Sequence, residues 1–559
     1  MASLAPFTGV LGHRRAAHLL RRASFRYTKP KIDQMAGQTA AQALASLLQL
    51  YPQQLDQPVY DDPTTTDVVE NIKWINPQVD PASFGAEDFQ LRRWLMGWWL
   101  NEALQDPGIG HKMSFFFHQY FITTANTLGT SHYFDYLALL RWGALGNFKK
   151  LATKMVTDNC MLRYLNNQEN VAGNPNENFA REFFELFTIG KGPQAGDGDY
   201  TNYTEADIVQ AARVFTGFRT RINRNVIDAE TGLPRGDANF FGLGGVQQHD
   251  SGDKEFSARF QNTIIQGSSN SAAMFDELNA FVNMIFAQDE TAKLTCRRLY
   301  RYFVSRNITD EIENDIIAPL ATTFRNNNYE IKPVLLQLLQ SEHFFDLDDS
   351  DNADEIVGGL IKTPLDLVLP AMSFFGVPIP DPLTQNTLHY IVLYSRGVLD
   401  RMLALSGLNL FFPSDVAGYP GFYQNPEFNR QWFNSSTIIA RYKLPQMLLS
   451  GKYQIGGNPN GLLGTKLNIA PWLKNSGVVS DPEDSYVVVQ DLLNYLLPEE
   501  VDNDRFEYFL NDVFLNGLPA DDWTYEWQNY LATNNAAEVT IPLERLINAI
   551  MYSPEYQTS

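Results

Sequence analysis

Helical periodicity is the sequence feature that most constrains the fold of this chain, because apolar side chains recur at helical spacing along most of it. The clearest example runs from Glu87 to Gln105, where Trp94, Trp98 and Trp99 fall near one side of a helix, and this tryptophan-rich face is either exposed or buried. Further helices are predicted at about 110–123, 131–158, 177–189, 204–217, 272–305, 309–326, 330–341, 385–405, 435–450, 484–516 and 540–552. The predicted fold class is therefore mainly α, as a large multi-helix body.

One segment departs from the helical pattern. Residues 216–227 alternate between apolar and polar in the manner of a strand, and a turn-rich stretch follows from Asp228 to Gly236. This pattern predicts a small β-hairpin insertion around residues 216–250.

Two shifts in composition divide the helical body. The acidic run from Asp346 to Glu355 predicts a solvated linker at 346–358, between a main helical domain at 1–345 and a C-terminal helical region at 359–559. Within the second region, residues 451–481 are rich in Gly, Asn and Pro, which predicts a long surface loop.

Charge limits the partners of the chain. It has 43 Lys and Arg residues against 64 Asp and Glu residues, which gives a net charge of −21. A nucleic-acid-binding protein needs a basic surface that displaces counterions from phosphates, so nucleic acid is not expected as a partner. The longest uncharged stretch, from Met113 to Phe134, contains too many polar residues to cross a bilayer, and no membrane span is expected.

The N-terminal region contains arginine pairs at 14–15 and 21–22, which are typical of some export signals. No apolar run with a cleavage site follows either pair, so we expect this segment to belong to the fold and expect no signal peptide. Cys160 and Cys296 lie far apart in apolar helical contexts, which favours two buried free thiols and leaves a disulfide open.

The central helical motif, residues 174–190, is the richest in chemistry-bearing side chains. Its Asn178, Glu182 and Glu185 share one face at spacings of four and three residues, with Arg181 beside them. Two carboxylates and an amide on one face are suited to holding a metal or to acid–base work. The alternative is an ordinary ion-pair network in which Arg181 bridges Glu177 and Glu185.

Two histidines extend the candidate site. His118 lies in an aromatic-rich helix, where it is either a hydrogen-bonded core residue or a ligand, and His249 precedes Asp250 on a Gly-rich loop. We predict that His118, Glu182, Glu185 and His249 meet at one site, with Asp250 as a further catalytic candidate. A divalent metal, a substrate or only a hydrogen-bond network would fill that site. The sequence contains none of the standard zinc-protease, nucleophile-elbow, phosphate-loop or dinucleotide signatures.

Several motifs in order along the chain carry a family resemblance. They are 18–25 (HLLRRASF), Met113 with His118 and Phe121, 176–190 (NENFAREFFELFTIG), 203–208 (YTEADI), 212–217 (ARVFTG), His249-Asp250 with Lys254, and 412–421 (FPSDVAGYPG). The chain resembles the large bacterial family of unknown function number eighteen hundred over roughly residues 10–450. It departs from the family pattern at Tyr120, where relatives often have a second histidine, and at Tyr419, where many have tryptophan.

The resemblance implies an uncharacterised helical protein with no established activity to transfer. Family members often accompany a second protein that resembles alkaline phosphatases and sulfatases and often carries a twin-arginine signal. We therefore predict a non-catalytic binding or assembly partner of such an exported protein, acting at or beyond the cell envelope. The alternative is a metal-assisted hydrolase that uses the His/Glu cluster. Co-export with the signal-bearing partner would place the chain in the periplasm or outside the cell, and a cytoplasmic location is the other option.

Overall fold

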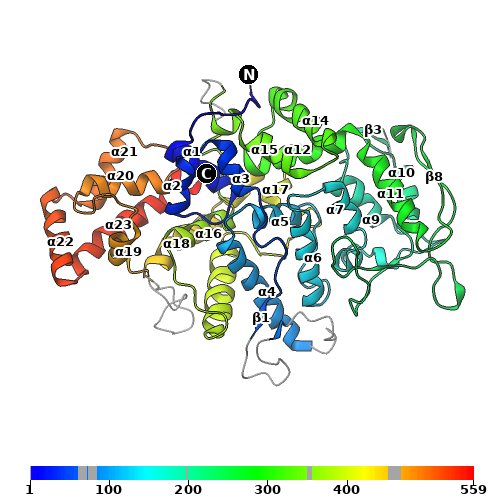
Figure 1. The fold of residues 1–559 in the computed structure, drawn as a ribbon, viewed down its shortest axis with the longest axis horizontal. Helices are drawn as coiled ribbons and strands as arrows, with labels where there is room; N and C mark the ends of the chain where they lie inside the picture. The colour runs from blue at the N-terminus through cyan, green and yellow to red at the C-terminus, as the bar shows by residue number, and fades with distance from the viewer. Residues whose placement is uncertain (1, 61–71, 74–84, 197–198, 349–355, 451–466) are drawn as a thin grey trace.

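The computed structural model describes residues 2–60, 72–73, 85–196, 199–348, 356–450 and 467–559, and helices dominate it (Figure 1). The helices up to the middle of the chain are α1 (Gly12–Ala23), α2 (Lys29–Ala36), α3 (Ala40–Leu47), α4 (Gly85–Gln105), α5 (Gly110–His118), α6 (Thr130–Gly143), α7 (Phe148–Met155), α8 (Asn159–Tyr164), η2 (Asn167–Glu169), α9 (Glu177–Glu182), η3 (Phe183–Phe187), α10 (Glu205–Val214), η4 (Leu243–Gly245), η5 (Ala258–Phe260) and α11 (Ala273–Phe286). The later helices are α12 (Asp289–Phe303), α13 (Asp310–Ile312), η6 (Glu313–Ile317), α14 (Ala318–Asn326), α15 (Ile331–Leu339), η7 (His343–Phe345), α16 (Pro364–Phe374), η8 (Thr387–Leu403), α17 (Pro420–Tyr423), η9 (Phe428–Trp432), α18 (Thr437–Ser450), α19 (Ile469–Ser476), α20 (Ser485–Leu496), α21 (Asn503–Glu507), η10 (Tyr508–Phe514), α22 (Ala520–Thr533), α23 (Ala537–Tyr552) and η11 (Glu555–Gln557). The predicted mainly α fold class is confirmed.

The strands are short and pair only as antiparallel hairpins in the described part of the chain. They are β1 (Val59–Tyr60) with β2 (Ile72–Lys73), β3 (Gln194–Gly196) with β4 (Asp199–Tyr200), β5 (Phe218–Arg219) with β6 (Asp237–Ala238), and β7 (Lys254–Glu255) with β8 (Ile264–Ile265). The β5–β6 pair, in which Phe218 lies opposite Ala238, confirms the hairpin predicted around 216–250.

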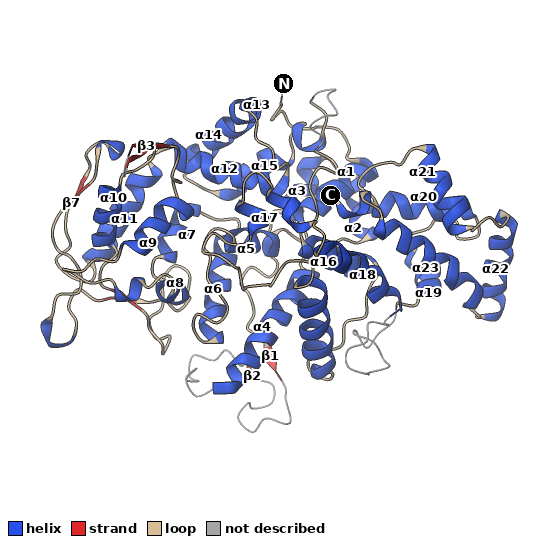
Figure 2. Ribbon diagram, turned by 180° about the vertical axis from the view of Figure 1, so that it is seen from behind, coloured by secondary structure: helices blue, strands red, loops and turns tan. Residues whose placement is uncertain are grey.

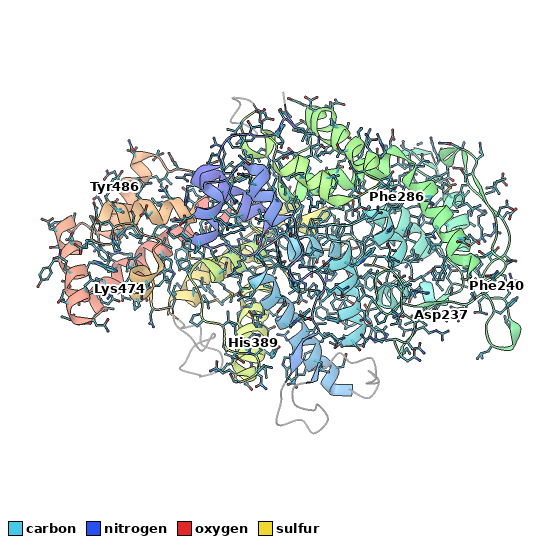
Figure 3. All side chains as sticks on the ribbon, viewed as in Figure 1. Asp237, Phe240, Phe286, His389, Lys474 and Tyr486 are labelled. Carbon is cyan, nitrogen blue, oxygen red and sulfur yellow. The ribbon has the colours of Figure 1, made fainter. Side chains whose placement is uncertain are left out.

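The helices form an elongated body (Figures 1 and 2). Helices α20–α22 lie at one end, and α9–α11 with the hairpins β5–β6 and β7–β8 lie at the other. Helices α5, α12, α16 and α17 lie between these ends, where the side chains of several elements come together (Figure 3). The middle of the molecule is therefore built from segments that are distant in the sequence.

The tryptophan-rich helix α4 is a core element. Trp94, Trp98 and Trp99 are at most 7% exposed, so the predicted tryptophan face is buried. Helix α4 packs along η8, where the ring centroids of Trp94 and Tyr390 are 6.0 Å apart. A side chain at Gly97 would meet Tyr394 of η8, so glycine allows the two helices to approach closely.

Helix α1 ties distant parts of the chain to the centre through two buried arginines. Arg21 donates to the carbonyl oxygens of Tyr495 and Leu497 at 2.7 and 2.9 Å. Arg22 donates to the carbonyl oxygen of Val304 at 3.2 Å. The arginine pair at 21–22 thus belongs to the fold, as its polar sequence context predicts.

The predicted loop at 451–481 is partly wrong. Residues 451–466 lie outside the described residues, but 469–476 form helix α19. Ile469, Ala470 and Leu473 are buried, and α19 packs against α23. Apolar burial therefore outweighs the loop-forming composition around it. Most of the predicted linker, 349–355, also lies outside the described residues, and the division into domains stays a prediction.

Two further predictions concern single features. Cys160 and Cys296 are buried free thiols, as their apolar contexts predict, and burial raises the pKa of both. Among the described residues, none of the helices combines the length and apolar character required to cross a membrane.

The buried ion pair between Arg224 and Asp135 yields a prediction about stability. Two hydrogen bonds of 2.7 and 2.8 Å join these side chains, which are only 4% and 3% exposed. Arg224→Met leaves the Asp135 carboxylate buried without its cation, and we expect a loss of about 3–5 kcal/mol in the free energy of unfolding. Arg259→Met removes the exposed pair with Asp199 and should cost about 0–1 kcal/mol. Equal shifts of the two urea denaturation midpoints would contradict this assignment.

Candidate functional site

His118 is a core residue at the C-terminal end of α5. Its side chain is fully buried, and its Nδ1 lies 2.8 Å from the hydroxyl of Tyr136. That hydroxyl donates to the carbonyl oxygen of Phe121, so His118 Nδ1–H is the donor to Tyr136. Burial lowers the pKa of His118 to about 3, and the imidazole is neutral at physiological pH. The rings of Phe411 and Tyr419 enclose it at 5.2 and 6.3 Å.

His249 belongs to a separate buried network. Its Nδ1 bonds to the carbonyl oxygen of Thr216 at 2.8 Å, and its Nε2 lies 3.0 Å from the carboxylate of Glu277 on α11. Lys254 makes an ion pair with the same carboxylate at 2.6 Å. Asp250 makes two bonds of 3.0 Å to Arg213. Both nitrogens of His249 are therefore occupied by groups that hold its loop against α10 and α11.

The central motif forms α9 followed by the π-helix η3. Arg181 binds Glu205 of α10 through two bonds of 2.7 Å, and its contact with Glu177 is longer, at 3.5 Å. Glu185 instead lies 3.9 Å from Lys191. The predicted bridge from Arg181 to Glu185 is not among the ion pairs of the described residues. Glu185 lies in the π-helical turn η3, which changes the positions of side chains around the helix axis after Glu182.

The predicted metal site does not form in this structure. The described residues contain no group of three or more His, Cys, Asp or Glu side chains that could hold a metal ion. His118 is enclosed by aromatic rings, and His249 is bound to Glu277. Glu182 and Glu185 remain as a carboxylate pair, and burial, followed by the charges of Glu185 and Asp415, raises the pKa of Glu182 to about 7.

A cavity of about 580 Å³ lies beside this carboxylate pair, in the middle of the molecule. Helices α1, α5, α12 and α17 contribute to its walls, together with the segment after η3 and the start of α16. We name it the arginine cavity because its lining contains eight cationic side chains and three carboxylates: Arg21, Arg22, Lys112, Lys191, Arg297, Arg298, Arg301, Arg306, Glu185, Glu290 and Asp366. The cavity is thus strongly basic inside a chain whose net charge is −21.

Four of the motifs that carry the family resemblance meet at this cavity. The first motif contributes Arg21 and Arg22, and the segment around His118 contributes Gln119 and Tyr120. The central motif contributes Glu185, Leu186, Ile189 and Gly190, and the late motif contributes positions 416, 417 and 421. Motifs that are separated by hundreds of residues therefore converge on one hollow.

Most cations of the arginine cavity have partners within the protein. Lys112 pairs with Asp366, and Arg297 pairs with Glu290 and with Glu313 at 2.6 Å. Arg21 and Arg22 donate to backbone carbonyl oxygens, and Lys191 lies near Glu185. The remaining three, Arg298, Arg301 and Arg306, make no ion pair with any carboxylate among the described residues.

Aromatic ring faces hold two of these unpaired arginines. The guanidinium of Arg298 lies over the ring of Tyr120 at 4.1 Å, and that of Arg301 lies over Phe428 at 4.7 Å. Stacking on a ring uses the face of a guanidinium and leaves its in-plane N–H donors available. Burial, followed by the charges of Arg297 and Arg298, lowers the pKa of Arg301 to about 10, so it stays charged at neutral pH.

Other polar groups in the cavity walls also lack partners within the described residues. The side-chain amides of Gln119 and Asn429, Arg301 Nε and Trp432 Nε1 are buried without a hydrogen bond. Buried polar groups are nearly always hydrogen-bonded in native proteins, to the protein, to water or to a ligand. Several such groups therefore face one cavity, where water or a polar ligand would have to supply their hydrogen bonds.

Sequence reasoning missed this site, although a signal was present. Three arginines occur within five residues, at 297, 298 and 301, on an amphipathic helix of a chain that is otherwise acidic. The pattern suggests an anion site only when the aromatic residues that support Arg298 and Arg301 are known, and these come from distant segments.

Comparison with known proteins gives one match. A family model described as protein of unknown function (DUF1800) matches residues 18–558. Neither the curated proteins nor the solved structures gave a match. The matched region includes the C-terminal helices, which extends the likeness beyond the motifs recognised in the sequence.

The raised pKa of Glu182 yields a prediction about pH. Because its folded-state pKa of about 7 lies above the ordinary value of 4.5, ionisation of Glu182 removes stability as the pH rises through this window. We expect Glu182→Gln to raise the melting temperature relative to wild type more at pH 8 than at pH 5.

Glu205 is the matched control for that experiment. Its hydrogen bond to Arg181 lowers its pKa, so its stabilising effect is present at neutral pH and is lost on acidification. Because that loss begins only below the ordinary pKa of 4.5, Glu205→Gln should lower the melting temperature at pH 8 and at pH 5 to a similar extent. An effect of Glu182→Gln that does not change between pH 5 and pH 8, or that lowers the melting temperature as Glu205→Gln does, would show that Glu182 is an ordinary exposed carboxylate.

Proposed function

The chain belongs to the DUF1800 family of proteins of unknown function, and from that premise we propose that it is a binding protein that holds a small organic anion in the arginine cavity. The proposal rests on one observation. Arg298 and Arg301 lie in the cavity wall, stack on aromatic rings and have no carboxylate partner among the described residues.

Electrostatics supports an anionic ligand. Neighbouring buried cations repel one another, and the low polarity of their surroundings strengthens that repulsion. Both side chains are half-buried, and this partial burial lowers the pKa of Arg298 as well as that of Arg301. A bound anion would offset this cost and accept hydrogen bonds from the free edges of both guanidinium groups.

The size of the cavity supports a small molecule as the ligand. Sites for small molecules commonly measure about 300–1,000 Å³, and the arginine cavity, at about 580 Å³, lies within that range. Its walls combine apolar rings with a few polar groups, which is the usual composition of such sites.

A binding role is compatible with the predicted partnership with an exported phosphatase- or sulfatase-like protein. That partnership, and the location at or beyond the envelope, stay predictions based on the resemblance. The metal-assisted hydrolase stays the alternative, and no contact among the described residues favours it over anion binding.

The proposal predicts that phosphate stabilises the protein through two named side chains. Inorganic phosphate, compared with potassium chloride at equal ionic strength, should raise the melting temperature of the wild-type protein. The expected gain in the free energy of unfolding is about 2.7 kcal/mol when the phosphate concentration reaches one hundred times its dissociation constant. The double variant Arg298→Gln, Arg301→Gln should lose this gain because both charged donors are removed.

Lys293→Gln provides the matched control. Lys293 lies on the same helix, α12, but does not line the cavity, so its replacement removes one positive charge without touching the site. This variant should keep the stabilisation by phosphate. If phosphate acts no differently from chloride on the wild type, or stabilises the double variant equally, the cavity is not an anion site.

A further inference from the structure

We infer that the ligand of the arginine cavity is a phosphate monoester that carries an aromatic group. This inference rests on the proposed anion-binding function and adds the chemical class of the ligand. It comes from two features of the cavity, the number of unpaired cations and the row of rings along another part of its lining.

The unpaired cations of the cavity favour a ligand that carries more than one negative charge. Arg298 and Arg301 are three residues apart on α12 and therefore lie on the same face of that helix. Arg306 follows the helix and lines the same cavity, again without a carboxylate partner among the described residues. A phosphate monoester carries about −1.5 to −2 charges at neutral pH, whereas a carboxylate or a sulfate ester carries one. Its three terminal oxygens also accept bidentate hydrogen bonds from guanidinium groups.

The aromatic side is a row of contacting rings. The ring of Tyr302 lies 5.2 Å from Phe116 and 5.8 Å from Phe422, and Phe422 lies 5.5 Å from Trp432. All four residues line the arginine cavity. Planar groups pack favourably against such rings in offset or edge-to-face arrangements.

Gly421 helps to build this row. A side chain at Gly421 would come within 2.4 Å of the Trp432 ring, so only glycine lets α17 approach η9 this closely. The ring of Phe422 is thereby held next to Trp432 and is half-buried at the cavity wall. A ligand whose phosphate lies at the arginines can extend an aromatic group toward this row within one cavity.

The test compares the affinities of four probes by isothermal titration calorimetry on the full-length protein. The probes are inorganic phosphate, phenyl phosphate, phenyl sulfate and benzoate. We expect phenyl phosphate to bind at least about tenfold more tightly than inorganic phosphate, because its ring is buried against the aromatic row. Phenyl sulfate and benzoate should bind more weakly than phenyl phosphate because each carries a single negative charge.

Variants separate the two halves of the inference. Phe422→Leu should remove most of the preference for phenyl phosphate over inorganic phosphate while leaving inorganic phosphate binding in place. Phe433→Leu, the same substitution at a ring that does not line the cavity, should leave both affinities unchanged. The melting temperature of each variant without ligand establishes that it is folded.

The outcomes distinguish failure of this inference from failure of the proposed function. Equal affinity for inorganic phosphate and phenyl phosphate would show that the ligand needs no aromatic group, but the cavity would still be an anion site. Tighter binding of phenyl sulfate or benzoate than of phenyl phosphate would overturn the phosphate assignment and assign a monoanion. Absence of binding by all four probes would overturn both the inference and the proposed function.

Discussion

Burial of arginine side chains at the centre of the molecule is the constraint on which the rest of the structure depends. Removing a cation from water costs several kcal/mol unless other groups compensate it. Arg21 obtains compensation from the carbonyls of Tyr495 and Leu497, which tie the N-terminal helix to the C-terminal helices. Arg298 and Arg301 lie over ring faces and have no carboxylate partner among the described residues. Arginines thus hold the centre together, and the proposed anion would bind where two of them lack a carboxylate partner.

The aromatic residues of the chain explain how this arrangement is supported. Phe116, Tyr302, Phe422 and Trp432 form one row of contacts that joins α5, α12, α17 and η9 around the cavity. The same kind of contact holds the arginines in place. An acidic protein with a basic interior attracts an anion only at short range, because its overall field is repulsive. Ring contacts inside the cavity would therefore contribute to affinity together with charge.

The sequence predicted the elements better than it predicted their contacts. Helix α4 follows from spacing alone, but the spacing leaves open whether its tryptophan face is exposed or buried. The β5–β6 hairpin follows from the change to strand-like alternation. Helix α19 was missed because its short apolar face lies in a Gly- and Asn-rich context and gains its stability from packing against α23. The predicted ion pair between Arg181 and Glu185 assumed α-helical spacing of 3.6 residues per turn, whereas Glu185 lies in the π-helix η3. The predicted joining of His118 with His249 required tertiary contacts that no spacing encodes, and both histidines have other partners.

A crystal structure of the wild-type protein with phenylphosphonate, a non-hydrolysable phosphate monoester analogue, tests the central claim most directly. We expect phosphonate oxygens about 2.7–2.9 Å from guanidinium nitrogens of Arg298 and Arg301, with the phenyl ring directed toward Phe422. We also expect both arginines to keep their contacts with Tyr120 and Phe428. An empty cavity at saturating ligand, or arginines that turn away to pair with carboxylates of the protein, would contradict anion binding at this cavity.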